Sequence, residues 1–221
     1  MKVIISGYGR MGHIIEEVLE RKGEAPVLAS GDICSVDREL ASQCVCIDFT
    51  SPDAFRANYR ILAENFKAVV VGTTGWNDIK DEVIAYFREC GTTMIYASNF
   101  SIGVNAFFAA LRRTGEVLRG HGYHADIEEI HHIHKLDAPS GTAKTMAGII
   151  GESLGSVPEI VSRREGEVPG THTAVFSSDV DRLVFTHEAF SRQGFAEGAV
   201  VAAEMADSIE GVYEFSELIL K

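Results

Sequence analysis

The sequence predicts an α/β protein with a doubly wound parallel sheet in its first half and an open antiparallel or mixed sheet in a second domain. Between residues 2 and 97, short apolar runs alternate with helical stretches, which is typical of β-α-β units. Beyond residue 170, segments of β composition follow one another without helices between them. The apolar helical stretch 103–117 is expected to lead from the first domain into the second.

Length and composition narrow the functional classes. At 221 residues the chain can form one large domain or two small ones. Its formal net charge of −12 argues against nucleic acid and anionic membranes as partners. No apolar window is long enough to span a membrane, and the N-terminus enters a strand without a signal peptide. The four cysteines form no CxxC pair, so we expect reduced thiols in a cytoplasmic protein.

In the first half, we predict strands over residues 2–6, 27–29, 44–49, 68–71 and 93–97, and helices over residues 13–21, 54–65 and 79–90. Gly7, Gly9 and Gly12 form a GxGxxG motif directly between the first strand and the first helix. In that position the glycines permit a tight turn, the approach of a pyrophosphate and close helix–strand contact. The motif therefore predicts a dinucleotide site; a glycine-rich turn without a ligand is the alternative.

Asp32 lies at the distance after the glycines where an acidic residue contacts the ribose hydroxyls of NAD. Its carboxylate would repel a 2′-phosphate, which favours NADH, although Arg10 and Arg38 offset that repulsion and leave dual use open. The other strand ends carry small or polar residues at Phe49-Thr50, Gly72–Thr74 and Asn99-Phe100. In a doubly wound sheet the ligand binds at these carboxyl ends.

In the second half, we predict a strand that includes residues 126–132, a helix over residues 142–154, and strands over residues 171–176 and 182–189. Residues 191–195 also have β composition, and residues 198–205 and part of 211–220 form the last elements. We assign no strand to residues 155–170, which are polar and rich in glycine and proline. An open sheet with one uncovered face commonly forms an oligomer interface.

The segment 128–150 crowds His131, His132, His134 and Lys135 before a turn and a Ser-Gly-Thr triplet. With Ser140 or Thr142 as the N-cap, the triplet starts a helix whose free N–H groups form an anion site. His131 and Lys135 add groups that can transfer protons near neutral pH. The simpler alternatives are a helix cap alone or a metal site, but the histidine spacing is not HExxH and no cysteine is close. We predict no metal ion.

These motifs resemble the 4-hydroxy-tetrahydrodipicolinate reductase family, long called dihydrodipicolinate reductases. The resemblance rests on GYGRMG from Gly7, IDFT from Ile47, VGTTG from Val71, NFSIGVN from Asn99 and, most specifically, HHIHKLDAPSGTA from His131. It continues through HTAVF from His172 and spans nearly the whole chain. It implies NAD(P)H-dependent reduction of hydroxy-tetrahydrodipicolinate, with loss of water, in lysine and diaminopimelate synthesis.

The resemblance also implies a Rossmann domain over residues 1–102 and 197–221 and a substrate-binding and tetramerisation domain over residues 103–196, in a homotetramer. It makes His131 the proton donor and Lys135 its partner, with a dicarboxylate substrate held by His132, Lys135, Ser140, Gly141 and Thr142. From motifs and resemblance together, the predicted cofactor-binding residues are Gly7, Gly9, Arg10, Met11, Gly12, Asp32, Phe49, Gly72, Thr73, Thr74, Ser98, Asn99 and Phe100.

Two departures from the family matter. The chain is short after the second strand and from Gly155, which weakens any transfer of 2′-phosphate contacts. Ala97-Ser98 also stands where the family often has Ala-Pro or Ala-Ala. Two other functions stay open: another Rossmann reductase of a dicarboxylate, and an NAD(H) sensor without chemistry. Neither needs His131 and Lys135 together with the Ser-Gly-Thr triplet.

Overall fold

The computed structural model describes residues 1–30 and 32–220, which fold into two compact units. Unit 1 comprises Met1–Ile102 and Arg192–Lys221, and unit 2 comprises Gly103–Ser191. The chain returns to unit 1 at Arg192, before the expected position 197, because helix α7 (Gln193–Ala206) begins earlier than the helix predicted from residue 198.

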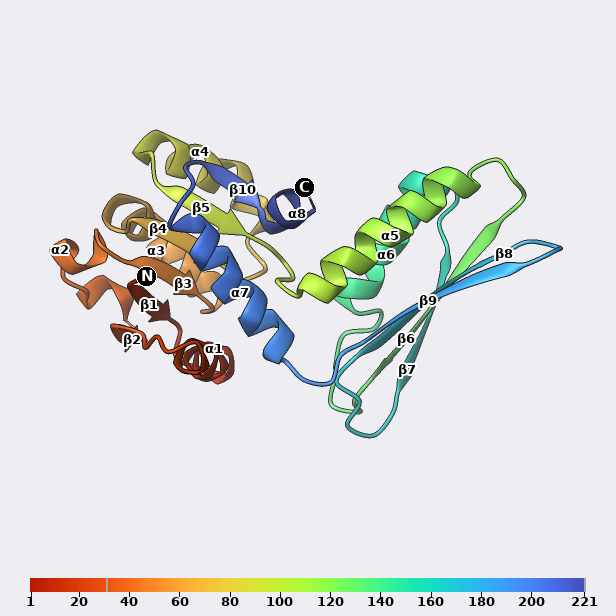
Figure 1. Ribbon diagram of the computed structural model, residues 1–221, viewed down its shortest axis with the longest axis horizontal. Helices are drawn as coiled ribbons and strands as arrows, with labels where there is room; N and C mark the ends of the chain where they lie inside the picture. The colour runs from red at the N-terminus through yellow and green to blue at the C-terminus, as the bar shows by residue number, and fades with distance from the viewer. Residues whose placement is uncertain (31, 221) are drawn as a thin grey trace. The chain divides into compact units, whose positions relative to one another are not determined.

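Unit 1 is built on a six-stranded parallel sheet in the order β10-β5-β4-β3-β1-β2 (Figure 1). Its strands are β1 (Val3–Ser6), β2 (Leu28–Ser30), β3 (Val45–Asp48), β4 (Ala68–Val71), β5 (Thr93–Tyr96) and β10 (Val212–Glu214). Its helices are α1 (Arg10–Arg21), α2 (Arg38–Ala41), α3 (Pro52–Asn65), α4 (Lys80–Cys90), α7 and α8 (Phe215–Ile219), with short 3₁₀ turns at Ile33–Ser35 and Asn77–Ile79. The predicted doubly wound parallel sheet is confirmed.

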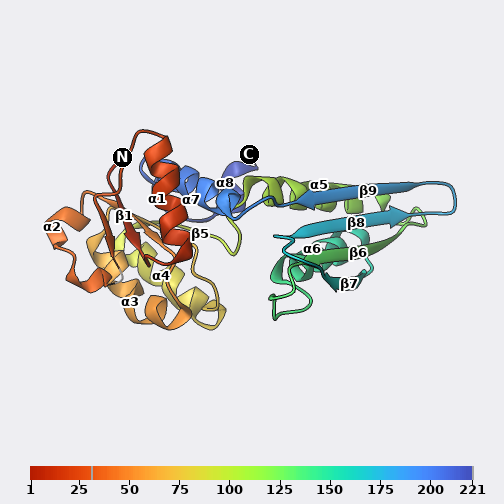
Figure 2. The same ribbon diagram turned by 90° about the horizontal axis from the view of Figure 1, so that it is seen from below.

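Helices cover both faces of this sheet, so its central strands are buried on both sides. Figure 2 shows α1 and α7 on one face and α3 and α4 on the other. In β1, Val3 and Ile5 pack in the core on the side of α1 and α7, whereas Ile4 packs in the core on the side of α3 and α4. Burial on both faces explains why these strands read as continuous apolar runs rather than as alternating ones.

Unit 2 contains a four-stranded mixed sheet in the order β7-β6-β8-β9. Its strands are β6 (His124–His131), β7 (Glu159–Arg164), β8 (Thr171–Ser177) and β9 (Arg182–Glu188). β6 runs parallel to β7 and antiparallel to β8, and β9 is antiparallel to β8. Helices α5 (Ile102–Leu118) and α6 (Gly141–Leu154) pack on one face of this sheet, and no helix of the described chain covers the other face (Figures 1 and 2).

The inward face of this sheet changes from apolar to polar along the strands. Ile127 on β6, Ala174 on β8 and Phe185 on β9 form one cross-strand row beneath the helices. The next row toward the end of β6 consists of Ser162, Glu129, His172 and His187, which are in register across all four strands. A buried polar row requires partners, because an unpaired polar group inside a protein costs free energy.

Two expectations are wrong in detail, and one helix was missed. Residues 155–170 contain strand β7, whose inward positions are Ile160, Ser162 and Arg164, so a single apolar residue gives no alternating pattern. Residues 191–195 form no strand, because α7 already begins at Gln193. Helix α2 was not predicted. The four cysteines are unpaired, and no helix in the described ranges has the length and apolar character that a membrane span requires.

Candidate active site

The glycine loop follows β1 and leads into α1. Gly7 has φ +89°, and a Cβ atom there would lie 2.5 Å from the carbonyl oxygen of Phe49. A Cβ at Gly12 would lie 2.5 Å from the carbonyl oxygen of Gly7. Gly9 is different, because it is the N-cap of α1 and a Cβ there would meet no atom within 4 Å. The fold itself therefore requires Gly7 and Gly12, whereas the space beside Gly9 fits the approach of a pyrophosphate.

The loop lies where the strand order reverses, between β1 and β3. A buried carboxylate, Asp48 at the end of β3, ties the neighbouring strand ends together. It accepts hydrogen bonds from the hydroxyls of Ser6 at 2.8 Å, Thr50 at 3.0 Å and Thr73 at 2.5 Å. Burial raises the pKa of Asp48, and these three hydroxyls act against that rise. Asp48 thus holds together the carboxyl edge of the sheet, where doubly wound sheets bind their ligands, a role that the sequence analysis missed.

Most of the other predicted cofactor residues lie at the same edge. Because β1, β3, β4 and β5 are parallel and in register, their carboxyl ends meet there. Arg10, Thr74 and Ser98 are exposed, and Met11, Phe49, Gly72 and Asn99 are half-buried. The ring of Phe49 packs against Gly72, where a Cβ would lie 2.1 Å from it.

Two of the predicted cofactor residues have their side chains engaged inside the protein. The Thr73 hydroxyl is bound in the Asp48 network, and the ring of Phe100 is 2% exposed and packs in the core against Phe215. Only the main chain of these two residues is available to a ligand. Asp32 is exposed after β2, and its carboxylate accepts a hydrogen bond from the N–H of Cys34 at 3.1 Å.

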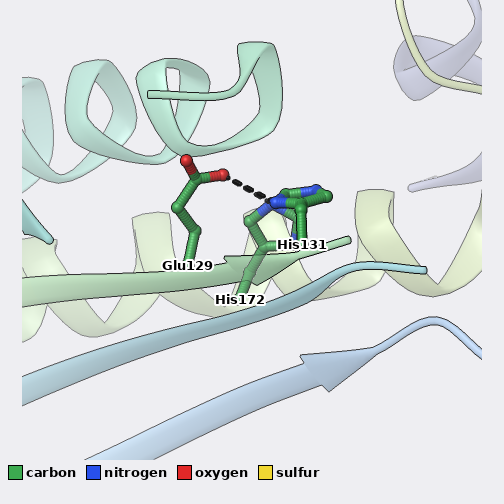
Figure 3. Close-up of side chains that lie close together, drawn as sticks. All are labelled: Glu129, His131 and His172. Carbon is green, nitrogen blue, oxygen red and sulfur yellow. Dashed lines mark ion pairs between the residues drawn. The ribbon is translucent and has the colours of Figure 1, made fainter. Parts of the chain in front are cut away.

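In unit 2, the end of β6 brings a carboxylate and two histidines together. Glu129 and His131 are adjacent inward positions of β6, and His172 lies opposite Glu129 on β8. All three are buried, with Glu129 0% exposed. Figure 3 shows the Glu129 carboxylate pointing toward the His131 ring, with the His172 ring beside it. Oε2 of Glu129 lies 3.0 Å from Nδ1 of His131 and 3.9 Å from Nε2 of His172.

The other oxygen of Glu129 faces the start of α6. Its Oε1 accepts a hydrogen bond from the N–H of Ser140 at 3.0 Å and one from the guanidinium of Arg164 at 3.3 Å. Arg164 also donates to the carbonyls of Lys135 and Asp137, at 3.3 and 2.5 Å. The segment between β6 and α6 is thereby attached to the sheet at several points.

Ser140 caps α6, as predicted, and accepts a hydrogen bond from the N–H of Ala143 at 3.2 Å. Its hydroxyl lies 3.2 Å from Nε2 of His172. Gly141 is exposed, and a Cβ there would meet no atom within 4 Å. The start of α6 at Gly141 therefore borders open space at the positive end of the helix dipole, which is suited to a carboxylate.

Lys135 and the remaining histidines lie on the segment after β6. The Lys135 ammonium is 2.8 Å from a carboxylate oxygen of Asp137, and this hydrogen bond holds the pKa of Asp137 below its ordinary value. His132 is half-buried, whereas His134 is exposed and lies 3.1 Å from Glu167. The structure thus gathers His131, Lys135 and the start of α6 in one region.

The charge states of the buried groups follow from their surroundings. Burial lowers the pKa of His131, while the Glu129 carboxylate opposes that shift. Burial and the neighbouring His131 lower the pKa of His172 to about 4, so His172 is neutral near pH 7. Burial alone would raise the pKa of Glu129, but the neighbouring Ser140 and Ser162 and the charge of His131 outweigh it and keep this pKa below its ordinary value. The centre is therefore an ionised carboxylate between two imidazoles.

Two histidines and a carboxylate within 4.8 Å are also a donor set that metal ions use. Here, however, the carboxylate is already neutralised by Arg164, and Lys135 adds a second cation close by. Fixed positive charges disfavour a divalent cation. The surroundings therefore suit proton transfer and anion binding better than metal chemistry.

The sequence analysis missed Glu129, Arg164 and His172 as parts of this site. The available signal was alternation: Glu129 continues the inward positions of β6 that begin with apolar residues, so it had to be buried. Its partners on β7 and β8 are far away in the sequence, and only the pairing of the strands shows them.

Comparisons with known proteins identify the family of this chain. Family models described as "Dihydrodipicolinate reductase, N-terminus" and "Dihydrodipicolinate reductase, C-terminus" match residues 1–100 and 103–219. The chain belongs to the dihydrodipicolinate reductase family. It is 40% identical to the 4-hydroxy-tetrahydrodipicolinate reductase of Christiangramia forsetii, over 99% of this chain and 98% of that one.

The corresponding Neisseria gonorrhoeae enzyme is 33% identical over 99% of this chain and 97% of its own length. A dipicolinate-bound dihydrodipicolinate reductase from Paenisporosarcina sp. TG-14 has the same fold, with a TM-score of 0.82, 19% identity and 99% coverage of both chains. The dihydrodipicolinate reductase fold therefore extends over 99% of this chain.

Proposed function

We propose that this member of the dihydrodipicolinate reductase family reduces (2S,4S)-4-hydroxy-2,3,4,5-tetrahydrodipicolinate to (S)-2,3,4,5-tetrahydrodipicolinate, with loss of water, in lysine and diaminopimelate synthesis. The observation that carries the proposal is the end of β6, where His131 lies beside the capped start of α6. This pairing supplies a proton donor next to an anion site. The 40% identity to a 4-hydroxy-tetrahydrodipicolinate reductase supports the same assignment.

The cofactor we propose is NADH or NADPH, bound at the carboxyl edge of the unit 1 sheet. The Gly7–Gly12 loop would hold the pyrophosphate, and the open space beside Gly9 fits that group. Gly72, Thr74, Ser98 and Asn99 would surround the nicotinamide end. When bound, the cofactor supplies a hydride to the conjugated imine that remains after the substrate loses its hydroxyl.

The residues of unit 2 bind the substrate and supply the proton. The amides of Gly141 and Thr142, the hydroxyl of Ser140, the ring of His132 and the ammonium of Lys135 would hold the two carboxylates. Reduction leaves negative charge on the substrate, and His131 donates the proton that neutralises it. Fixing both carboxylates restricts the substrate to one orientation, which lowers the entropic part of the barrier.

The direct test is oxidation of NADH and NADPH by the purified protein, with substrate generated in the assay by the preceding synthase from pyruvate and aspartate semialdehyde. We expect oxidation that depends on the synthase. An absence of oxidation with both cofactors, together with measurable NADH binding, would contradict the proposed reaction and favour another dicarboxylate substrate or an NAD(H) sensor.

For the cofactor, we propose a preference for NADH, set by the charge of Asp32. Replacing Asp32 by asparagine removes the charge and keeps a side chain that can cap the turn at Cys34. We expect the ratio of kcat/KM for NADPH to that for NADH to rise about ten-fold, because a like charge no longer opposes the 2′-phosphate. Asp32→Ala should raise the ratio similarly but also lower stability slightly. An unchanged ratio in both variants would remove Asp32 from the ribose site.

We further propose a cytoplasmic homotetramer assembled through the uncovered face of the unit 2 sheet. Val161 on β7 and Val184 on β9 are 51% and 55% exposed on this face. Val184→Asp should convert the tetramer into smaller species in light scattering, because burying an unpaired carboxylate in an interface is costly. Val157→Asp, which changes a 79% exposed valine between α6 and β7, is the matched control. Equal masses for the two variants would exclude this face.

A further inference from the structure

The contacts of Glu129 exceed what folding of β6 requires. Its carboxylate is fully buried and is shared by groups from β6, β7, β8 and the start of α6. Burying an ionised carboxylate costs several kcal/mol unless each oxygen has good partners. An apolar residue would fill this inward strand position at lower cost, as Ile127 does two residues earlier. A specific task for the charge explains why it is there.

The two oxygens of Glu129 face different parts of the site. Oε1 is saturated by the N–H of Ser140 and by Arg164. Oε2 makes no hydrogen bond and lies 3.0 Å from the buried Nδ1 of His131, which also makes none. A small rotation of the ring would align an Nδ1–H donor with this oxygen.

The other ring nitrogen of His131 lies on the side of Gly170. A Cβ atom at Gly170 would be 3.1 Å from Nε2 of His131 and 3.7 Å from the ring of His172. The absence of a side chain at this position leaves room beside Nε2. Of the two ring nitrogens, Nδ1 therefore serves Glu129, and Nε2 is the one available to a substrate.

We propose that Glu129 is a positioning residue that joins the two halves of the substrate site: it holds His131 with Nε2 available for proton transfer and holds the start of α6 for carboxylate binding. His172 assists from β8, where its Nε2 lies close to both the Ser140 hydroxyl and Oε2 of Glu129. This assignment rests on the proposed function and adds to it residues that do not contact the reacting atoms.

The sign of the expected pH effect follows from the groups around His131. Glu129 on β6 and Asp137 on the following segment favour the imidazolium; Arg164 on β7 and Lys135 oppose it. Burial also opposes it, and His172 on β8 is neutral near pH 7. Loss of the Glu129 charge therefore lowers the pKa of His131, and loss of the Arg164 charge raises it. A proton donor must be protonated, so the high-pH fall in kcat should move in the same directions.

The decisive variant is Glu129→Gln, which keeps a carbonyl oxygen for the Ser140 N–H. Its amide N–H₂ would face Nδ1 of His131 as a donor, which removes the proton that the imidazolium needs there. We expect kcat at pH 8 to fall about ten- to hundred-fold, the high-pH limb of the profile to move to lower pH, and the affinity for dipicolinate to change little. Glu129→Ala, which loses both contacts, should weaken dipicolinate binding as well.

Three comparisons separate this role from a purely structural one. Glu128→Gln changes the preceding residue of β6, which pairs with Arg163 on the opposite face of the sheet, and should leave the pH profile unchanged. Arg164→Gln should move the high-pH limb in the opposite direction. In a His131→Ala background, Glu129→Gln should lower kcat no further. A wild-type pH profile for Glu129→Gln, or a full additional loss in the His131→Ala background, would overturn the proposal.

Histidine NMR titration tests the assignment without turnover. The pKa of His131, assigned by its absence in His131→Ala, should be lower in Glu129→Gln than in wild type and higher in Arg164→Gln. If these shifts occur but the protein reduces no substrate, the proposed function fails and the positioning role stands. If the protein is active but the His131 pKa is the same in all three proteins, the positioning role fails alone. Circular dichroism identifies any variant that does not fold. If Glu129→Gln does not fold, the His131 pKa and the pH profile of Arg164→Gln test the positioning role instead.

Discussion

Replacing His131 by alanine is expected to lower turnover by about 10²-fold or more, the usual effect of removing an acid–base group. The affinity for NADH should stay nearly unchanged, because every residue predicted to bind the cofactor belongs to unit 1 and His131 belongs to unit 2. Lys135→Ala should lower turnover by a similar factor. Turnover is measured with synthase-generated substrate and NADH affinity by isothermal titration calorimetry.

The matched control is His134→Ala. His134 is on the same segment, but its side chain is 67% exposed, pairs with Glu167 at the surface and meets the site through its ring contact with His132. This variant should keep nearly wild-type turnover, because a surface pair of this kind contributes little. A collapse of NADH binding in the His131 or Lys135 variant would show that these residues act on the cofactor side and would contradict the assignment.

The ion pair of Lys135 with Asp137 changes the expected effect of Lys135→Ala. Its ammonium is already paired with Asp137 at 2.8 Å, so a substrate carboxylate must share or displace that partner. Lys135→Ala should therefore raise KM as well as lower kcat, whereas His131→Ala should act mainly on kcat. The different responses follow from one residue binding the ground state and the other acting only on the developing charge.

Much of the fold could be predicted because local and tertiary preferences agree. Strands β1, β3 and β4 are buried on both faces and therefore read as uninterrupted apolar runs. The start of α6 was recognised because Ser140 has the side chain that an N-cap requires. The buried strands and the N-cap each depend on a few residues that are neighbours in the chain, so one sequence is enough to predict them.

The errors occur where distant packing decides. Strand β7 has Ser162 and Arg164 at inward positions beside the buried carboxylate of Glu129, and of its inward positions only Ile160 packs against the apolar core. Helix α7 contains small residues because it lies directly against the backbone: a Cβ at Gly198 would be 1.7 Å from the carbonyl oxygen of Phe100. Neither requirement appears in the residues of the segment itself.

The residues of the candidate site also fall into two groups, those that are close in sequence and those that only strand pairing brings together. His131, Lys135 and the Ser-Gly-Thr triplet are close in sequence and form a recognisable motif. Glu129, Arg164 and His172 come together only through the pairing of β6 with β7 and β8. The residues expected to touch ligands could thus be predicted, whereas those that hold them in place required the structure.

The glycine loop allows folding and ligand binding to be separated by experiment. Gly7→Ala should destabilise the protein strongly, because the residue has φ +89° and its Cβ would lie 2.5 Å from the backbone of Phe49. Gly9→Ala should leave the melting temperature nearly unchanged, since its Cβ would meet no protein atom within 4 Å. The same methyl group would occupy the space proposed for the pyrophosphate, so we expect NADH affinity to fall about ten-fold or more.

Calorimetric melting gives the stability of Gly7→Ala and Gly9→Ala, and titration with NADH gives their cofactor affinity. Gly23→Ala is a third variant: it changes another positive-φ glycine, in the turn after α1, where the backbone is strained but no atom lies within 4 Å of the new Cβ. It should lower stability modestly and leave NADH affinity intact. Wild-type NADH affinity in Gly9→Ala would show that the open space beside Gly9 is not where the nucleotide binds, and the cofactor site would then have to be sought elsewhere along the edge of the sheet.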